Sequence, residues 1–223
     1  MKRVLIAGDT HFPWVDSGCL ARFYKAIGHH KPDVIVQIGD LYDMYSHSKF
    51  PRKADLCTSK EELCEARDGA ESFWKNCRKE ASRKCEFIQL LGNHDERPSK
   101  RINERYPEIA SLVGIDDLFK FAGVRTILDT RSEFTIDSVI YTHGHFTGIT
   151  GKHAAYYGRS VVHGHTHRGG VVYHRLHGRT IWELDVGYMA GSAEPLQYTA
   201  TKTTKWTHGY GLVDEHGPRF VAF

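Results

Sequence analysis

The chain contains 223 residues, of which 40% are hydrophobic and 26% are charged, a balance typical of a soluble globular protein large enough for one α/β domain. No apolar run approaches the roughly 18 residues of a membrane span, and the first apolar run is too short for a signal peptide. The five cysteines show no C-x-x-C spacing and favour reduced thiols in a cytoplasmic protein over a disulfide-rich secreted one. The formal net charge of +3 permits a phosphate-bearing partner without requiring one.

The first predicted elements alternate between short strands and helices. The apolar run at residues 4–7 predicts a buried strand. Residues 16–30 carry apolar side chains at three-to-four spacing and predict a helix. Residues 34–38 predict a second strand, parallel to the first because a helix connects the two. Residues 45–55 have no clear period, and we expect them to form a loop over the carboxyl ends of these strands.

Residues 59–84 predict the longest helix, part of a helical insertion at about residues 57–85. Ser59 and Glu62 form a capping-box pattern at its start. Small and apolar side chains then follow a nearly strict heptad stripe, formed by Leu63, Ala66, Ala70, Phe73, Cys77 and Ala81. We interpret this stripe as packing on the sheet. Two alternatives are that the stripe, with Trp74 beside it, is partly exposed and serves a homo-oligomer or partner, or that the basic end of the helix faces nucleic acid.

The second half of the chain changes from helices to short strands. Residues 97–122 are predicted to be mostly helical, with breaks at Pro107 and Gly114. A further short helix is predicted at residues 152–157. Strands are predicted at residues 87–91, 126–128, 134–136, 138–142, 160–162, 170–173, 180–186, 205–213 and 219–223, with a hairpin turn at 214–217. Since there is no repeat and no linker rich in Pro or Ser, we expect a single domain over residues 1–223.

Polar clusters follow five of the predicted strands. Each one delivers Asp, Asn or His at the end of an apolar run. Ligands of open α/β sheets bind at the carboxyl ends of the strands, so five clusters of one chemical character indicate a single polar site. The clusters are Gly8-Asp9-Thr10-His11, Gly39-Asp40-Leu41-Tyr42-Asp43, Gly92-Asn93-His94-Asp95, His143-Gly144-His145 and His163-Gly164-His165-Thr166-His167.

The spacing within these clusters suits metal ligands. Asp9 and His11 are two residues apart, so on an extended segment their side chains point the same way, and His165 and His167 repeat that spacing. Carboxylate and imidazole without thiolate favour Mn, Fe, Zn or Ni. We interpret His145 and His163 as residues that cap a turn or satisfy a buried polar group. The remaining histidines are interpreted as surface or loop residues: His29, His30, His47, His153, His174, His177, His208 and His216.

Taken together and in this order, the five blocks resemble those of the calcineurin-like metallophosphoesterase superfamily, in its compact bacterial and viral form. The resemblance covers residues 8–167. It implies an α/β fold, a four-layer α/β/β/α sandwich of two mixed β-sheets, and a dinuclear centre of two divalent metal ions. We expect Mn, with Fe, Zn or Ni as alternatives, and a cytoplasmic location, which is the host cytoplasm if the chain is viral.

The resemblance also implies a role for each matching position. His94 would lie beside the substrate as a catalytic acid, and Asp43 would be the carboxylate that hydrogen-bonds it. A hydroxide held by both ions would attack phosphorus, and a histidine kept charged by a carboxylate would protonate the leaving group. One metal ion would be held by Asp9, His11, Asp40 and His167, and the second by Asp40, Asn93, His143 and His165.

Two departures from the superfamily pattern bear on the substrate. The phosphoprotein phosphatases carry Arg after the second block and Glu after Asn-His of the third, whereas this chain has Met44 and Asp95. Protein phosphatase activity is therefore not expected. We predict a phosphoesterase acting on phosphodiesters of nucleotides or nucleic acid, with a phosphomonoesterase, or a non-catalytic binding module on the same fold, as alternatives. The preference rests on mild basicity and on cations after the second and third blocks: Lys49, Arg52, Lys53, Arg97, Lys100 and Arg101.

Overall fold

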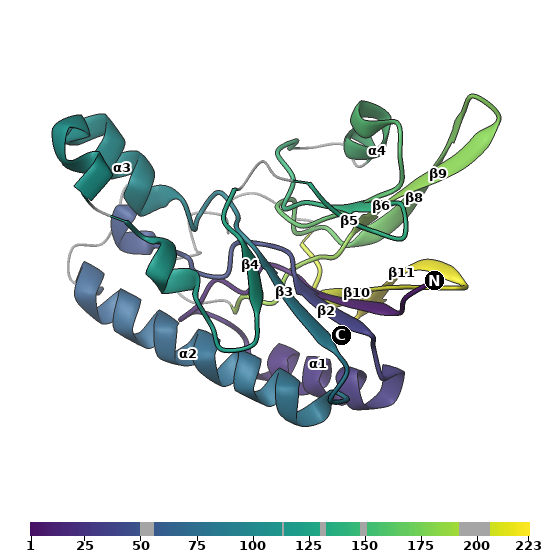
Figure 1. Ribbon diagram of the computed structural model, residues 1–223, viewed down its shortest axis with the longest axis horizontal. Coiled ribbons are helices and arrows are strands. Elements are labelled where there is room, and N and C mark those ends of the chain that lie inside the picture. Colours follow the sequence, from purple (N-terminus) through teal and green to yellow (C-terminus); the bar gives the residue numbers. More distant parts are fainter. Residues whose placement is uncertain (50–55, 113, 130–132, 148–150, 192–205) are drawn as a thin grey trace.

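The computed structural model describes residues 1–49, 56–112, 114–129, 133–147, 151–191 and 206–223. Two mixed β-sheets form its framework (Figure 1). The strands are β1 (Val4–Ala7), β2 (Val34–Gln37), β3 (Glu86–Leu90), β4 (Arg125–Ile127), β5 (Phe134–Ile136), β6 (Val139–Tyr141), β7 (Val161–His163), β8 (Gly170–Leu176), β9 (Arg179–Asp185), β10 (Gly209–Asp214) and β11 (Gly217–Ala222).

The first sheet has the strand order β11-β10-β1-β2-β3-β4, and the second has the order β5-β6-β7-β9-β8. In the first sheet β1 to β4 are parallel, and the β10–β11 hairpin adds two antiparallel strands at one edge. In the second sheet β6, β7 and β9 are parallel, while β5 and β8 pair antiparallel at the edges. The parallel strands of each sheet therefore end at one common edge.

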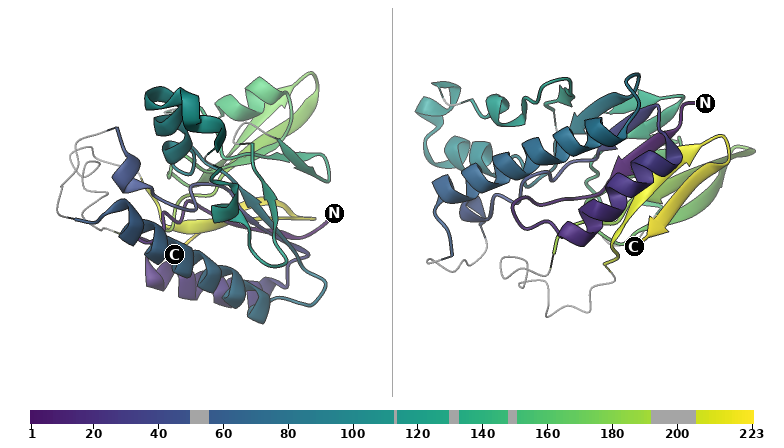
Figure 2. Two further views of the ribbon diagram at one scale, coloured as in Figure 1. Left: turned by 60° about the vertical axis from the view of Figure 1, so that its left-hand side comes forward. Right: turned by 90° about the horizontal axis from the view of Figure 1, so that it is seen from below.

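Helices cover the outer faces of the two sheets. Helices α1 (Ser17–His30) and α2 (Ser59–Glu80) lie side by side on the first sheet (Figure 2), and the short helix α4 (Lys152–Tyr157) packs on β7 and β9 of the second. The arrangement is the predicted α/β/β/α sandwich. The connections contain α3 (Arg97–Arg105) and the 3₁₀ helices η1 (Tyr45–His47), η2 (Pro107–Leu112) and η3 (Asp116–Phe119).

Alternation along the strands builds two hydrophobic cores. Leu5 of β1 faces the helices and packs in the first core with Phe23 and Phe73. Its neighbour Val4 faces the second sheet and packs in the second core with Leu184. Successive side chains of a strand point to opposite faces, so strands buried on both faces appear in the sequence as continuous apolar runs.

The longest helix begins differently from the prediction. The capping box is formed by Thr58 and Glu61, one residue earlier than the predicted pair Ser59 and Glu62. Glu62 is instead 1% exposed and accepts hydrogen bonds from the backbone N–H groups of Tyr45 and Ser46. This glutamate ties η1 to α2, and the helix ends at Glu80, four residues before the predicted end.

The heptad stripe of α2 packs on the sheet, as interpreted from the sequence. Ala66, Ala70, Phe73 and Cys77 lie in the first core, and Trp74 has no exposed surface. The alternative that these five side chains are exposed to a partner is therefore wrong, because they are buried within one molecule, whereas Leu63 and Ala81 near the two ends of the stripe are half-buried.

The remaining predicted elements are found with small shifts at their ends. Residues 50–55 of the predicted loop lie outside the described ranges, as does residue 205 at the start of the predicted strand that the structure begins at Gly209. The predicted hairpin is confirmed by the pairing of Asp214 with Gly217. In the described part of the chain, no helix combines the length and hydrophobicity needed to span a bilayer.

Candidate metal centre

The residues of the five blocks converge where the parallel strands of both sheets end. Asp9 follows β1, Asp40 follows β2, and Asn93 with His94 follows β3. On the second sheet His143 follows β6, and His165 and His167 follow β7. The structure therefore brings all of the predicted ligand residues to one edge, as the strand pattern indicated.

Two glycines leave space for the carboxylates. A Cβ atom at Gly92 would lie 2.1 Å from Oδ1 of Asp40, and one at Gly164 would lie 2.2 Å from Oδ1 of Asp9. Both contacts are far shorter than a van der Waals distance, so any side chain would displace the carboxylate. These glycines belong to the third and fifth blocks, and their presence follows from the close approach of an Asp of the opposite loop.

The first group of donors consists of Asp9, His11, Asp40 and His167, whose donor atoms all lie within 4.8 Å of one another. Nε2 of His167 lies 2.7 Å from Oδ2 of Asp9 and 3.4 Å from Nε2 of His11. All four residues are buried. Their nitrogen and oxygen atoms therefore point at one common space.

The second group consists of Asp40, His143 and His165, again within 4.8 Å of one another. Nε2 of His143 lies 3.3 Å from Oδ2 of Asp40 and 3.1 Å from Oδ1 of Asn93, which brings the asparagine into the same group. Asp40 belongs to both groups. Its carboxylate lies between two sets of donors, which is the placement of a bridging ligand.

The donor set fits divalent cations. Asp9 Oδ1 is buried and accepts no hydrogen bond from the described residues, so it is available to a ligand. Burial lowers the pKa of His165 to about 4, which leaves this imidazole neutral as metal ligation requires. Burial alone would raise the pKa of Asp40, but the adjacent histidines, His143 foremost, outweigh it and hold that pKa well below its ordinary value. Ionised carboxylates and neutral imidazoles are the ligands that first-row divalent metals take.

One carboxylate connects His11, a predicted metal ligand, to His94. Asp43 is 1% exposed, and its Oδ1 lies 2.9 Å from Nδ1 of His11 and 2.9 Å from Nδ1 of His94. The sequence predicted the contact with His94 but not the one with His11. The general tendency of metal-bound histidines to donate their second N–H to a carboxylate was the signal that could have found it.

Arg97, on the first turn of α3, also contacts His94. Its Nη2 lies 2.8 Å from Nε2 of His94, and its Nη1 donates to the Asp43 carbonyl oxygen at 2.8 Å. Burial disfavours a charged His94, but the carboxylates of Asp40 and Asp43 outweigh it and raise the pKa of His94. The arginine donor can contact only a neutral imidazole, so this geometry is that of neutral His94 with its proton on Nδ1.

The other cations noted after the second and third blocks do not share this contact with His94 in the described part of the chain. Lys100 forms an exposed ion pair with Glu96 on the same helix, and Arg101 donates to the Ser46 carbonyl oxygen at 3.2 Å. Arg52 and Lys53 lie outside the described residues. Of the cations that follow the third block, Arg97 is thus the one that contacts His94.

Asp95 is a positioning residue that the sequence did not assign. It is fully buried and accepts hydrogen bonds from the backbone N–H groups of Tyr42 at 2.9 Å and Gly92 at 2.8 Å. Burial and the charge of Asp40 raise its pKa to about 7. This side chain fastens the loop of the second block to that of the third.

A third buried group joins His153 of α4 to His163 of β7 and Glu183 of β9. His153 is 1% exposed, so its interpretation as a surface or loop residue is wrong. Its Nε2 accepts the backbone N–H of His145 at 3.2 Å, which places the proton on Nδ1 and argues against metal ligation there. Nε2 of His163 lies 3.0 Å from Glu183, and its Nδ1 donates to the Gly164 carbonyl oxygen. We interpret this group as an internal network that supports the loops carrying His143 and His165.

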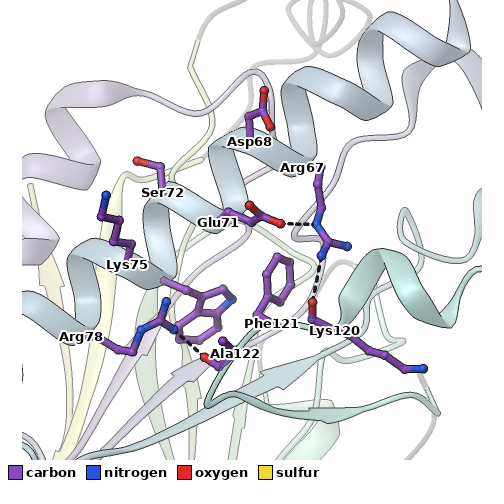
Figure 3. Close-up of a pocket in the computed structure, with 10 residues that line it drawn as sticks. Arg67, Asp68, Glu71, Ser72, Lys75, Arg78, Lys120, Phe121 and Ala122 are labelled. Atoms are coloured by element: carbon purple, nitrogen blue, oxygen red, sulfur yellow. Dashed lines mark hydrogen bonds and ion pairs between the residues drawn. The ribbon is translucent and has the colours of Figure 1, made fainter.

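A separate pocket lies along the middle of α2, between Arg67 and Arg78. The pocket has a volume of about 520 Å³ and lies between α2 and residues 120–122 (Figure 3). Arg67 donates to Glu71 and to the Lys120 carbonyl oxygen, and Arg78 donates to that of Ala122. These two guanidinium groups connect α2 to residues 120–122, and the alternative that the basic end of the helix faces nucleic acid stays a prediction.

Comparison with known proteins gives a family and close relatives. The family model for calcineurin-like phosphoesterases matches residues 2–169. The Gene 54 protein of Mycobacterium phage D29 is 30% identical over 245 residues, covering 97% of this chain and 90% of the relative. The Gene 54 protein of Mycobacterium phage L5 is 29% identical over 248 residues, with the same coverage.

Solved structures with a similar fold have low sequence identity. They include the phosphoesterase YfcE from E. coli, at 15% identity and a TM-score of 0.45, covering 96% of this chain and 88% of that one. Vps29 from Entamoeba histolytica, complexed with Zn²⁺, has 14% identity and a TM-score of 0.45, covering 96% of this chain and 87% of that one.

Proposed function

Because the chain belongs to the calcineurin-like phosphoesterase family, we propose that it is a metal-dependent phosphoesterase acting on phosphodiesters of nucleotides or nucleic acid. The observation that carries this proposal is the convergence of two donor groups, one buried and one partly buried, on one buried carboxylate, Asp40. Burying ionised carboxylates costs free energy, and cations in the space between the donors would offset this cost.

The proposed ligands divide between two sites that share Asp40. Nitrogen and oxygen donors without thiolate favour Mn, with Fe, Zn or Ni as alternatives. When bound, the two cations would lower the pKa of a water molecule and neutralise the charge of the phosphate. One site would be formed by Asp9, His11, Asp40 and His167, and the other by Asp40, Asn93, His143 and His165.

His94 would act on the leaving group. Its Nδ1 is held by Asp43 Oδ1 at 2.9 Å, so its Nε2 is the atom that can transfer a proton. The carboxylates of Asp40 and Asp43 favour the charged imidazole, which suits a general acid near neutral pH. For Nε2 to carry a proton, Arg97 must leave the contact that it makes with the neutral ring.

Two observations bear on the type of ester. The mild positive charge of the chain and the cations of α3, of which Arg97 contacts His94, support a nucleotide or nucleic acid substrate. A phosphomonoesterase is the second candidate, because the Arg97 guanidinium beside His94 would interact more strongly with a dianionic phosphate than with a diester monoanion.

The test begins with elemental analysis of freshly purified protein. Turnover is then measured with each reconstituted metal on bis-p-nitrophenyl phosphate, p-nitrophenyl phosphate, cyclic nucleotides, and single- and double-stranded DNA. We expect faster diester than monoester turnover in Mn. Faster monoester turnover would assign the second candidate, and metal-replete protein inactive on the whole panel would favour a non-catalytic binding module.

A further inference from the structure

Arg97 is placed beside His94 by the local backbone. Its backbone N–H donates to the His94 carbonyl oxygen at 3.0 Å, so the third block leads directly into α3. The side chain is 14% exposed and turns inward. The main chain fixes the guanidinium in this position, because its Nη1 donates to the Asp43 carbonyl oxygen at 2.8 Å.

The second guanidinium nitrogen contacts Nε2 of His94, the ring atom that would face the substrate. Nη2 of Arg97 lies 2.8 Å from Nε2 of His94, while Nδ1 of that ring is engaged by Asp43. Any phosphoryl group within hydrogen-bond distance of His94 Nε2 therefore lies beside Arg97 as well. The planar guanidinium presents several donors in one plane and matches phosphate oxygens in pairs.

The residue after the second block does not supply a cation here. Met44 is 1% exposed and packs in the first core. Arg97 instead brings a permanent positive charge to the same loop, through its contact with the main chain of Asp43. The charge therefore comes from the start of α3, just after the third block, and not from the residue after the second block.

We propose that Arg97 binds a non-bridging oxygen of the substrate phosphate, and that this contact contributes more to binding of a dianionic phosphoryl group than of a diester monoanion. This inference rests on the proposed function. The contact of Nη1 with Asp43 anchors the side chain while Nη2 exchanges His94 for the phosphate oxygen. The arginine transfers no proton and forms no covalent bond, so it acts only through its hydrogen bond and its positive charge.

The test compares Arg97→Ala and Arg97→Lys with wild type and with Arg105→Ala, an exposed arginine on the last turn of the same helix. Each full-length variant is loaded with Mn and checked for metal content and thermal unfolding. Steady-state kinetics are measured on p-nitrophenyl phosphate and bis-p-nitrophenyl phosphate. Binding of inorganic phosphate is measured by calorimetry, which reports on Arg97 whether or not either ester is turned over.

We expect Arg97→Ala to weaken phosphate binding and lower kcat/KM for the monoester by roughly 10–100-fold, the loss expected for one charge-assisted hydrogen bond. The diester should lose less because its phosphate carries one charge. Arg97→Lys should recover part of the loss, added guanidinium should partly restore Arg97→Ala, and Arg105→Ala should match wild type.

Two results would overturn the assignment. Unchanged phosphate affinity in metal-loaded Arg97→Ala would show that the guanidinium only supports the Asp43 loop. Equal losses on both esters, accompanied by lost metal and no rescue by guanidinium, would show the same. If wild type binds metal and phosphate but hydrolyses nothing, the proposed function fails while the role of Arg97 in phosphate binding is still decided by calorimetry.

Discussion

Asp43 offers a sharp test of how the site is connected. Its Oδ1 accepts from Nδ1 of both His11 and His94 at 2.9 Å, so replacing Asp43 with alanine removes two charge-assisted hydrogen bonds at once. Each such bond contributes about 1.5–3 kcal/mol. One bond orients a proposed metal ligand and the other orients the proposed acid, so the loss should appear in two different measurements.

The expected magnitudes follow from those two roles. Loss of a positioned general acid lowers kcat by about 10²–10⁴-fold, and loss of the partner of a metal-bound histidine weakens metal affinity by about 10–100-fold. Asp43→Ala should show both effects. His94→Ala should show only the first, with its metal content intact, because His94 is not a proposed ligand.

Asp43→Asn provides a graded control. An asparagine Oδ1 could still accept from both rings, so the tautomers would persist while the charge is lost, and charged hydrogen bonds are roughly twice as strong as neutral ones. Its losses should lie between wild type and Asp43→Ala.

The assay combines metal titration of the chelator-treated variants with kcat at saturating Mn. In a double variant, Asp43→Ala with His94→Ala, kcat at saturating metal should fall little further than in either single variant, because both remove the same function. Wild-type metal affinity in Asp43→Ala, or fully additive losses of kcat in the double variant, would refute the connection through Oδ1.

Three further predictions concern stability. Burial opposes charge on His143, but the carboxylates of Asp40 and Asp9 outweigh it and raise its pKa to about 9. The charged imidazole therefore stabilises the folded state fully below about pH 6.5, and this contribution is lost as the pH rises through about 9. Thermal melts of metal-free protein should show the free energy of unfolding falling by up to about 3 kcal/mol over that interval. A flat profile would contradict it. Glu183→Gln breaks the buried pair with His163 and should cost about 3–5 kcal/mol in urea unfolding; a wild-type midpoint would show that the pair is dispensable. Trp74→Ala should cost about 3–5 kcal/mol with metal affinity unchanged, and altered affinity would instead link that core to the site.

The convergence of the five blocks followed from the sequence more directly than the exact start of α2. Five polar blocks follow apolar runs, and parallel strands carry their carboxyl ends to one edge, so convergence could be expected without coordinates. The start of α2 was harder, because Thr58-x-x-Glu61 and Ser59-x-x-Glu62 both fit a capping box. The choice is made by tertiary structure, which buries Glu62 under the backbone of η1.

Residues that act through long-range contacts had no local signal. His153 lies in a predicted helix, but its burial depends on α4 packing on β9, and its partner Glu183 is 30 residues away in the sequence. Arg97 was noted only as one of several cations after the third block. That it turns inward while Lys100 pairs with Glu96 at the surface is decided by the direction in which α3 leaves the site.

Several residues of the site have a strained backbone, which contacts between the site loops must enforce. Of the nine non-glycine residues with positive φ in the described part of the chain, five belong to the site loops: His11, Asp40, Met44, His165 and His167. Each such conformation costs about 1–2 kcal/mol and persists where surrounding contacts enforce it. Asp9 and Asp40 supply two such contacts. Asp9 Oδ2 accepts the backbone N–H of His165 at 2.9 Å, from the first sheet to the second, and Asp40 Oδ1 accepts that of His94 at 2.8 Å, between the loops after β2 and β3 of the first sheet. In each aspartate one carboxylate oxygen therefore fixes another loop of the site, and Oδ1 of Asp9 and Oδ2 of Asp40 are left to the two donor groups.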